Sequence, residues 1–323
     1  MNFEIEQGLD FDDVLIKPIP SLLNSRNDVD ISVKLSDALS LSFPVIASPM
    51  RGIVDAYFAS CLSELGGVAI LPRFFNTLEE WKGEIDKISV AKNFGLSMGL
   101  KDNFEWLLER APDILCVDVA NGYTKNLLNI CRNIKNYIVK NNLKTLLMSG
   151  NVATFDGFKN LESAGVDLIR VGIGPGALCS TRNVTGIGIP QITAISECSR
   201  TNNSIIVADG GIKNSGDAVK AFVAGADVIM AGSLFGQTYE SPNDGTIYGM
   251  ASKRLQEEMD FTQIKSIEGI EKAMAKTMSL EKFVNDFSWG IRSAGTYLNA
   301  KNISEIKNKG EFILSGKNSI KDL

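Results

Sequence analysis

The feature that most constrains the fold is a regular alternation of eight short apolar runs with longer amphipathic segments. The runs span residues 44–50, 67–72, 94–100, 114–121, 145–152, 168–176, 204–211 and 228–235. Segments between them, such as DAYFASCLSEL, place apolar residues three and four positions apart, as amphipathic helices do. Alternating strands and helices form parallel βαβ units, and eight strands are the number that closes a barrel. The sequence therefore predicts an α/β protein with a (β/α)₈ TIM barrel.

A doubly wound open sheet is the alternative for the same alternation. Such a sheet carries its glycine-rich turn after the first strand, whereas here the glycine-rich turns follow the sixth, seventh and eighth runs. Barrels gather their phosphate sites at the last strands, so this placement favours the barrel. Residues 236–289 break the rhythm and are polar. We therefore expect a flap insertion after strand 8, within a single catalytic domain that spans residues 1–323.

Composition and charge narrow the function classes. The net charge is −5 and the isoelectric point is near 5.1, which disfavours a nucleic-acid-binding surface. The N-terminus lacks the pattern of a signal peptide, and no apolar run reaches the roughly 18 residues of a membrane span. The five cysteines are scattered without metal-ligand spacing, so we interpret them as reduced thiols of a cytoplasmic protein. Histidine is absent, so any proton transfer must use other side chains.

The stretch VGIGPGALCSTRNVTGIGIPQ, residues 171–191, carries the strongest chemical signal. Its glycines and Pro175 form a loop after the sixth run, in which backbone amides and carbonyls are unshielded. Cys179 lies in this loop beside Ser180, Thr181 and Arg182. A polar, electropositive setting at the catalytic face of a barrel lowers the pKa of a thiol. We therefore predict that Cys179 is a nucleophile, in preference to a buried structural cysteine.

Several motifs together resemble one enzyme family. They are the loop of Cys179, DGGIKNSGDAVKAFVAGAD, GSLFGQTYESP, YGMAS and GNVAT. In combination they resemble the IMP dehydrogenases and GMP reductases, over almost the whole chain. The resemblance implies a (β/α)₈ barrel, a homotetramer, and a covalent bond between a cysteine and purine C2 of a nucleotide monophosphate, GMP or IMP. It further implies that a nicotinamide cofactor exchanges hydride with that carbon.

The resemblance assigns roles by motif position. It implies three catalytic residues, which are Cys179, Thr181 and Glu268. It implies a nucleotide site made of Ser48, Met50, Asp209, Gly211, Gly232, Ser233, Tyr248, Gly249 and Met250. In this site the resemblance implies that Asp209 binds the ribose hydroxyls, that Gly211, Gly232 and Ser233 bind the phosphate, and that the Tyr248 hydroxyl adds a hydrogen bond to it. It implies that the nicotinamide cofactor contacts Asp118, Asn121, Gly122, Gly150 and Asn151. It also implies a K⁺ site formed by the backbone carbonyls of Gly174, Gly176 and Cys179.

The choice between reductase and dehydrogenase depends on the flap. Dehydrogenases of the family activate water with an Arg-Tyr pair there, and no such pair stands between Met250 and Glu268. DVANGY and RSAGTY are also typical of reductases, and no CBS regulatory domain interrupts the barrel, whereas GIPQITAI and SPM are more typical of dehydrogenases. The favoured hypothesis is NADPH-dependent reduction of GMP to IMP and ammonia. An IMP dehydrogenase that uses NAD to make XMP, and a non-catalytic or altered-specificity nucleotide-binding relative, stay open as alternatives.

Four positions depart from the family pattern. An acidic residue and a threonine normally follow SPM, but Arg51 and Gly52 stand there, so this edge of the nucleotide site carries the opposite charge. The lysine expected after the second strand is replaced by Arg73, which is permanently protonated and cannot donate a proton. The usual serine before the nucleophile is Ala177, which removes one phosphate contact.

Overall fold

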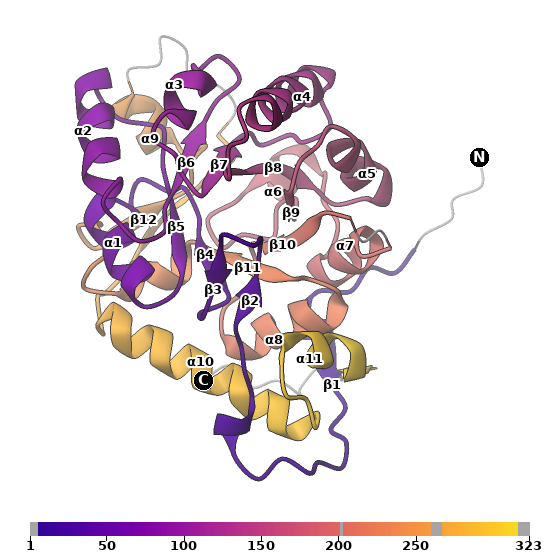
Figure 1. Ribbon diagram of the computed structural model, residues 1–323. Helices are drawn as coiled ribbons and strands as arrows, with labels where there is room; N and C mark the ends of the chain where they lie inside the picture. Colours follow the sequence, from indigo (N-terminus) through magenta and orange to yellow (C-terminus); the bar gives the residue numbers. More distant parts are fainter. Residues whose placement is uncertain (1–5, 201–202, 260–266, 316–323) are drawn as a thin grey trace.

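The barrel predicted from the eight apolar runs is confirmed by a computed structural model, which describes residues 6–200, 203–259 and 267–315 (Figure 1). Eight parallel strands close on one another in the order β10-β11-β4-β5-β6-β7-β8-β9. The strands are β4 (Val45–Ala47), β5 (Val68–Leu71), β6 (Gly95–Met98), β7 (Ile114–Val117), β8 (Leu146–Val152), β9 (Leu168–Val171), β10 (Ile205–Asp209) and β11 (Val228–Ala231). Each strand lies entirely within one of the eight runs.

Helices follow the strands and surround the barrel (Figure 1). They are α1 (Ala56–Glu64), α2 (Leu78–Ile88), α3 (Phe104–Leu108), α4 (Lys125–Lys140), α5 (Phe155–Ser163), α6 (Thr181–Thr185), α7 (Gln191–Cys198) and α8 (Ser215–Ala224). Most begin at a residue whose side chain accepts a hydrogen bond from a first-turn amide, as Asp55 does for α1 and Thr124 for α4. Such caps satisfy amides that have no partner inside the helix. The capping residues therefore mark where the loop that follows a strand ends and the next helix begins.

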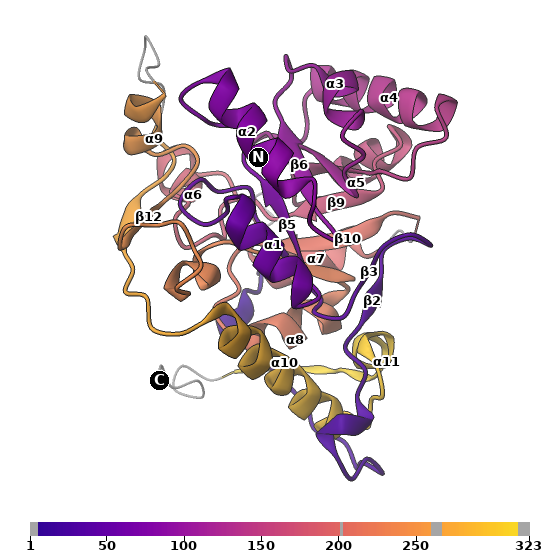
Figure 2. The same cartoon turned by 60° about the vertical axis from the view of Figure 1, so that its left-hand side comes forward.

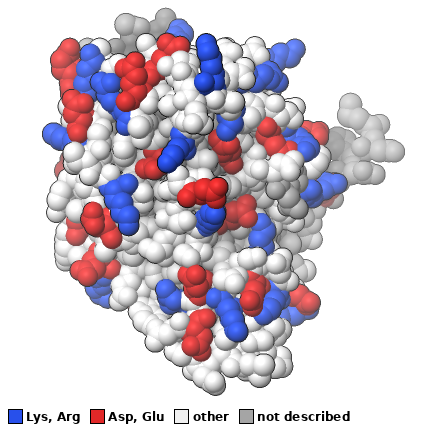
Figure 3. Space-filling model, viewed as in Figure 1, with Lys and Arg blue, Asp and Glu red and all other residues white. Residues whose placement is uncertain are grey.

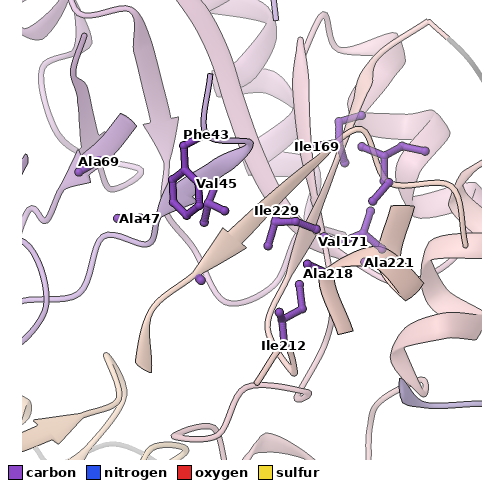
Figure 4. Close-up of a cluster of buried hydrophobic side chains, with 14 of the residues drawn as sticks. Phe43, Val45, Ala47, Ala69, Ile169, Val171, Ile212, Ala218, Ala221 and Ile229 are labelled. Atoms are coloured by element: carbon purple, nitrogen blue, oxygen red, sulfur yellow. The ribbon is translucent and has the colours of Figure 1, made fainter. Parts of the chain in front are cut away.

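Strand residues alternate between two apolar cores. Inward residues such as Ile46, Val68 and Met148 form one cluster inside the barrel. Outward residues such as Val45, Ile169 and Ile229 pack against the helices, and Figure 4 shows part of this layer with Ala218 and Ala221 of α8. Side chains of a strand point to opposite faces with a period of two, so strands covered on both faces are apolar throughout. This explains why the eight runs are continuous rather than alternating.

The amino end of the barrel is closed by the chain that precedes it. The strands β2 (Val33–Lys34) and β3 (Ser40–Leu41) pair with each other. Leu35, Leu39 and Leu41 of this hairpin join the inner cluster. A plugged amino end leaves the carboxyl ends of the strands as the open face, where loops of a barrel carry its site.

The two ends of the described chain lie side by side. Strand β1 (Val14–Ile16), preceded by the short helix η1 (Phe11–Asp13), pairs antiparallel with β14 (Phe312–Leu314). The 3₁₀ helix η2 (Arg26–Asp28) contacts α10 (Leu280–Tyr297), and α11 (Ile303–Lys309) contacts α8. On the face in Figure 3, acidic and basic side chains are interspersed. Among the described residues, no helix combines the length and the hydropathy that crossing a bilayer requires.

The insertion after the eighth strand has more structure than its polarity suggested. It contains η3 (Ser233–Gln237), β12 (Thr246–Tyr248), α9 (Lys253–Glu258) and β13 (Glu271–Ala273). We call residues 246–259 and 267–273 the flap; Figure 2 shows β12 and α9 along one side of the molecule. The prediction that the insertion extends to residue 289 was wrong. Helix α10 already begins at Leu280, because Ser279 caps it and Phe283 and Phe287 bury its first turns.

Candidate functional site

A chain of three polar side chains joins the loop after β9 to the flap. The Cys179 thiol donates a hydrogen bond to Thr181 Oγ1 over 3.1 Å. The Thr181 hydroxyl in turn donates to Glu268 Oε2 over 2.8 Å. Cys179 and Glu268 are 89 positions apart, and the fold brings them into one hydrogen-bonded relay. A proton can pass along this relay from the sulfur to a carboxylate, which is the arrangement that activates a nucleophile.

Backbone pairing fixes the relay. The amide of Ser180 donates to the carbonyl of Glu268 over 2.9 Å, and the amide of Ile270 donates to the carbonyl of Leu178 over 3.0 Å. On its other side, this flap segment receives a bond from the amide of Gly249, whose acceptor is the carbonyl of Ile270 at 3.1 Å. Residues 268–270 therefore lie between the other arm of the flap and the loop of residues 172–180, which we call the catalytic loop because it carries the predicted nucleophile. Glu268 is held by the main chain on both sides.

Two glycines permit this close packing. A Cβ on Gly269 would lie 2.8 Å from the amide nitrogen of Ser252, and one on Gly249 would lie 2.7 Å from the carbonyl oxygen of Leu178. Contacts this short with backbone atoms force the backbone to move. Gly249 was predicted to lie in the nucleotide site, whereas no pattern in the sequence distinguished Gly269.

Gly269→Ala is expected to lower kcat about tenfold, because moving Glu268 by a fraction of an ångström misaligns the relay. The matched control is Gly83→Ala in α2, where an added Cβ meets nothing within 4 Å. Steady-state kinetics on both variants check the prediction. Equal activity of the two variants would contradict the assigned role of Gly269.

Accessibility distinguishes Cys179 from the other cysteines. It is exposed, Cys61 is partly exposed, and Cys116, Cys131 and Cys198 are buried. Burial raises the pKa of the Cys116 and Cys198 thiols to about 12 and that of Cys131 to about 11. These three thiols stay protonated and shielded at neutral pH. None of the five forms a disulfide.

Arg182 does not supply the positive charge that the sequence suggested for the thiol. Its guanidinium donates to the carbonyls of Ile173 and Ile189 at 3.2 and 2.7 Å, and to Asp10 Oδ2 at 3.2 Å. The guanidinium therefore braces the loop, and Asp10 compensates its charge. The hydrogen-bond partners of the sulfur are instead Thr181 and, through it, Glu268.

Asp209 and Asp118 are joined by a residue that the sequence analysis missed. Arg170 lies on β9 inside the barrel and is buried. Its NH1 contacts Asp118 Oδ1 at 2.6 Å, and its Nε donates to Asp209 Oδ2 at 2.9 Å. Asn151 Nδ2 donates to the same oxygen of Asp209 at 2.8 Å. The ribose-binding and cofactor-binding residues implied by the resemblance thus form one hydrogen-bonded network near the carboxyl ends of the barrel strands.

A signal for Arg170 was present in the sequence. It is the one charged residue in the strand LIRV, where a fully buried strand is otherwise apolar. A charge in such a strand is buried only if opposite charges meet it.

The predicted phosphate-binding residues lie at the ends of β10 and β11. Gly211 has φ of +80°, a conformation that side chains rarely adopt, and packs against Pro175 of the catalytic loop. A Cβ on Gly232 would lie 2.4 Å from Met50 Sδ, so Met50 covers that glycine directly. The Ser48 amide donates to the carbonyl of Ala231, and Ser233 begins η3. These loops meet at one face of the barrel.

Tyr248, which was also predicted to bind the nucleotide, directs its hydroxyl to a residue of the flap. It is buried, and its hydroxyl donates to Glu258 Oε2 over 3.1 Å. Burial, with the neighbouring Glu258 charge, raises the pKa of Tyr248 to about 12. Its phenol therefore stays protonated and engaged with a carboxylate of the flap. Met250 follows it in the turn and is partly buried.

The residues assigned to the cofactor lie after β7 and at β8. The amide of Gly122 donates to the carbonyl of Asn151 over 3.0 Å, so the loop after β7 contacts strand β8. Asn121 accepts a bond from the amide of Tyr123, and it lies exposed at the rim. Gly150 packs so tightly that a Cβ would lie 2.6 Å from the carbonyl oxygen of Arg170. The cluster borders the Arg170 network, on the side away from the phosphate loops.

One of the carbonyls assigned to K⁺ already accepts a backbone hydrogen bond. The carbonyl of Gly176 accepts the amide of Cys179 at 3.0 Å. Gly174 has φ of +76° and lies against the Arg182 side chain. Among the described residues there is no group of three or more acidic or cysteine side chains that could hold a metal ion.

Comparison with known proteins agrees with this geometry. Residues 8–322 match the family model described as "IMP dehydrogenase / GMP reductase domain". The chain belongs to the IMP dehydrogenase / GMP reductase family. This confirms the resemblance of the loop and strand-end motifs. Similar proteins include the GMP reductase of Caenorhabditis elegans, 32% identical over 96% of this chain and 92% of the relative.

Bacterial relatives give the same result. The GMP reductase of Aliivibrio salmonicida is 32% identical, and that of Shewanella pealeana 30% identical, each over 97% of this chain and 96% of the relative. The likeness is therefore spread over the whole barrel and the flap, and is not confined to the catalytic loop.

Proposed function

We propose that this chain reduces GMP to IMP and ammonia, with NADPH as the hydride donor. The observation that carries the proposal is the relay from the exposed Cys179 thiol through Thr181 to Glu268. A protein that only bound nucleotide would have no need of a thiol connected to an acid-base pair. The relatives that cover nearly the whole chain are named GMP reductase, which favours the reductive direction.

The first half of the reaction is covalent addition. The sulfur of Cys179 forms a bond to C2 of the purine while the thiol proton passes through Thr181 to Glu268. The same path returns the proton to the 2-amino group, so that the C2–N bond breaks and ammonia leaves. A C2=N double bond then remains, with sulfur still attached to C2. The relay serves first as a base and then as an acid.

The second half removes the sulfur. Bound NADPH would supply a hydride to C2. The C–S bond then breaks, Cys179 leaves as a thiolate, and IMP is released with hydrogen at C2. One hydride and one proton are consumed for each ammonia formed, and the thiolate regains its proton from solvent before the next cycle.

The nucleotide would be held at the carboxyl ends of β10, β11 and β4. Asp209 has an oxygen available beyond the one that Arg170 and Asn151 share, and a carboxylate suits the ribose hydroxyls. Gly211, Gly232 and Ser233 suit the phosphate through backbone amides and one hydroxyl, with Ser48 nearby. Met50, Gly249 and Met250 would face the base. The Tyr248 hydroxyl reaches the phosphate only if it leaves Glu258.

The cofactor would lie beside the nucleotide, against Asp118, Asn121, Gly122, Gly150 and Asn151. These residues suit a dinucleotide because Asp118, Asn121 and Asn151 offer polar side chains, with Asn121 exposed at the rim, and the Gly122 amide bonds to the Asn151 carbonyl. The carbonyls of Gly174, Gly176 and Cys179 are retained as the proposed K⁺ site. A single domain over residues 1–323, a homotetramer and a cytoplasmic location complete the proposal.

Turnover with defined substrate pairs tests the function. When purified protein is mixed with GMP and NADPH, absorbance at the reduced nicotinamide band should fall. One molecule of ammonia should be released for each NADPH oxidised. NAD with IMP should give no XMP. Turnover of only the second pair would establish the dehydrogenase, and tight GMP binding without turnover of either pair would establish a non-catalytic binder.

Glu268→Gln is expected to lower kcat about 100-fold, because the amide can accept the Thr181 hydrogen bond but cannot take its proton. Glu271→Gln is the control, since Glu271 is exposed in β13 three positions away. Stopped-flow measurement of NADPH oxidation on both variants checks this. Similar rates for the two would remove Glu268 from the mechanism.

A further inference from the structure

Arg51 lies one position after Met50, which packs on Gly232 at the nucleotide site. An acidic residue was expected at this place, so the positive charge is a departure that the family pattern does not explain. Its side chain is 19% exposed, which is low for an arginine in a loop. The surroundings of Arg51 therefore decide what the departure does.

Arg51 contacts two other segments of the catalytic face. Toward the loop after β5, its NH1 donates to Asn76 Oδ1 at 3.2 Å, and its NH2 lies 4.0 Å from Glu80 Oε1 in α2. Toward the flap, its NH1 lies 3.9 Å from Glu258 Oε2 and 3.6 Å from Met259 Sδ. One guanidinium thus links the β4 loop, the start of α2 and the end of α9.

Glu258 is the flap residue whose carboxylate faces the Arg51 guanidinium. Its Oε2 also accepts the Tyr248 hydroxyl at 3.1 Å, and its Oε1 accepts Arg254 Nε at 2.8 Å. Arg254 in turn lies over the Tyr248 ring, 4.7 Å from its centroid, and 3.4 Å from Asp244 Oδ2. The carboxylate joins α9 to β12 and holds both against Arg51.

Tyr248 passes the constraint to the catalytic residues. It lies opposite Glu271 in the β12–β13 pair, and the next residue, Gly249, bonds to Ile270. Ile270 and Glu268 pair with the catalytic loop at Leu178 and Ser180. A displacement of β12 would therefore reach Glu268 through two consecutive backbone pairings.

We propose that Arg51 is a positioning residue that, through Glu258 and Tyr248, holds the flap segment bearing Glu268 in place beside Cys179. The inference rests on the proposed reductase, in which Glu268 moves the protons. A partly exposed ion pair of this kind shifts an equilibrium by a factor of about 5 at most, and the added contacts to Asn76 and Met259 extend that range.

The test compares Arg51→Met, Glu258→Gln and their combination at saturating GMP and NADPH. Each single variant is expected to lower kcat about three- to tenfold, and the double variant no further, because both act through one link. Arg51→Lys should recover part of the loss. The ratio of wild-type to Arg51→Met kcat should fall toward one in high salt, since salt screens the pair. Unchanged kcat in both single variants would overturn the proposal.

Glu257→Gln is the matched control. Glu257 neighbours Glu258 on the same helix and pairs with Lys253 at 3.2 Å on an exposed surface. This variant should keep wild-type kcat, and a loss equal to that of Glu258→Gln would show only that α9 is sensitive to charge, against the proposal.

Hydrogen exchange separates this inference from the proposed function. In the presence of GMP, the amides of Gly249, Glu268 and Ile270 should exchange several-fold faster in Arg51→Met than in Glu257→Gln. That result would support the positioning role even if GMP and NADPH gave no turnover, which would refute the proposed function alone. Equal exchange in the two variants would overturn the positioning role while leaving the reductase intact.

Discussion

Cys179→Ser should abolish turnover, with kcat reduced by about 10⁴-fold or more. The serine hydroxyl can still donate to Thr181, so the geometry of the relay is preserved. A hydroxyl is a far weaker nucleophile at neutral pH than a thiol, and its bond to C2 is not made. GMP affinity should stay within about threefold, because phosphate and ribose are assigned to residues at the carboxyl ends of β10 and β11. NADPH oxidation measures the first expectation and titration calorimetry with GMP the second.

The control for this variant is Cys61→Ser, on α1 and away from the relay. It should retain full activity. Intact-mass measurement adds a direct readout, because a purine adduct trapped by acid quenching should appear on the wild type and on Cys61→Ser, and be missing from Cys179→Ser. Retained turnover in Cys179→Ser would disprove covalent catalysis by this residue.

The barrel could be predicted because its information is local. Each strand is a run of buried residues such as VAIL at 68–71, and most helices have their own capping residue, as Asp55 is for α1. Such patterns require no knowledge of distant residues. The candidate nucleophile could be found in the same way, because Cys179 stands within a glycine-rich loop at the end of a strand.

The parts that could not be predicted depend on contacts between distant segments. Whether the Tyr248 hydroxyl faces a phosphate or Glu258 depends on where α9 packs. The partner of Arg182 is Asp10, which is 172 positions away. The onset of α10 at Leu280 depends on Phe283 and Phe287 packing against the barrel, which a polar sequence composition conceals. The function, by contrast, could be predicted only from the family motifs, because the barrel fold occurs in enzymes that catalyse many different reactions.

Arg170 contributes both to the stability of the barrel and to the proposed nucleotide site. Removing its charge should therefore lower the free energy of unfolding and the affinity for GMP. Burial lowers the pKa of Arg170, but the charges of Asp209 and Asp118 outweigh that effect and hold the pKa well above its usual value. The guanidinium is therefore always charged. Its Nε and NH2 both lie 2.9 Å from Asp209 Oδ2, and its NH1 lies 2.6 Å from Asp118 Oδ1.

Arg170→Met fills most of the same volume but leaves the carboxylates of Asp118 and Asp209 without their cation. Breaking a buried pair in this way costs about 3–5 kcal/mol of the free energy of unfolding. Lys135→Met is the matched control, because the Lys135–Asp167 pair has a similar distance of 2.7 Å but is partly exposed. That variant should lose about 1 kcal/mol or less. Urea unfolding of both variants measures the difference, and equal losses would contradict the central role of Arg170.

The same variant tests how the network serves the site. Adding Asp118→Asn and Asp209→Asn to Arg170→Met removes the unpaired charges, so stability should recover by more than half of what was lost. Nucleotide affinity should not recover, because the amide at position 209 is a poorer acceptor for two ribose hydroxyls than a carboxylate. Recovery of stability without recovery of GMP binding would show that GMP binding needs the Asp209 carboxylate, which Arg170 holds in place. Recovery of both would reduce Arg170 to a structural counter-ion.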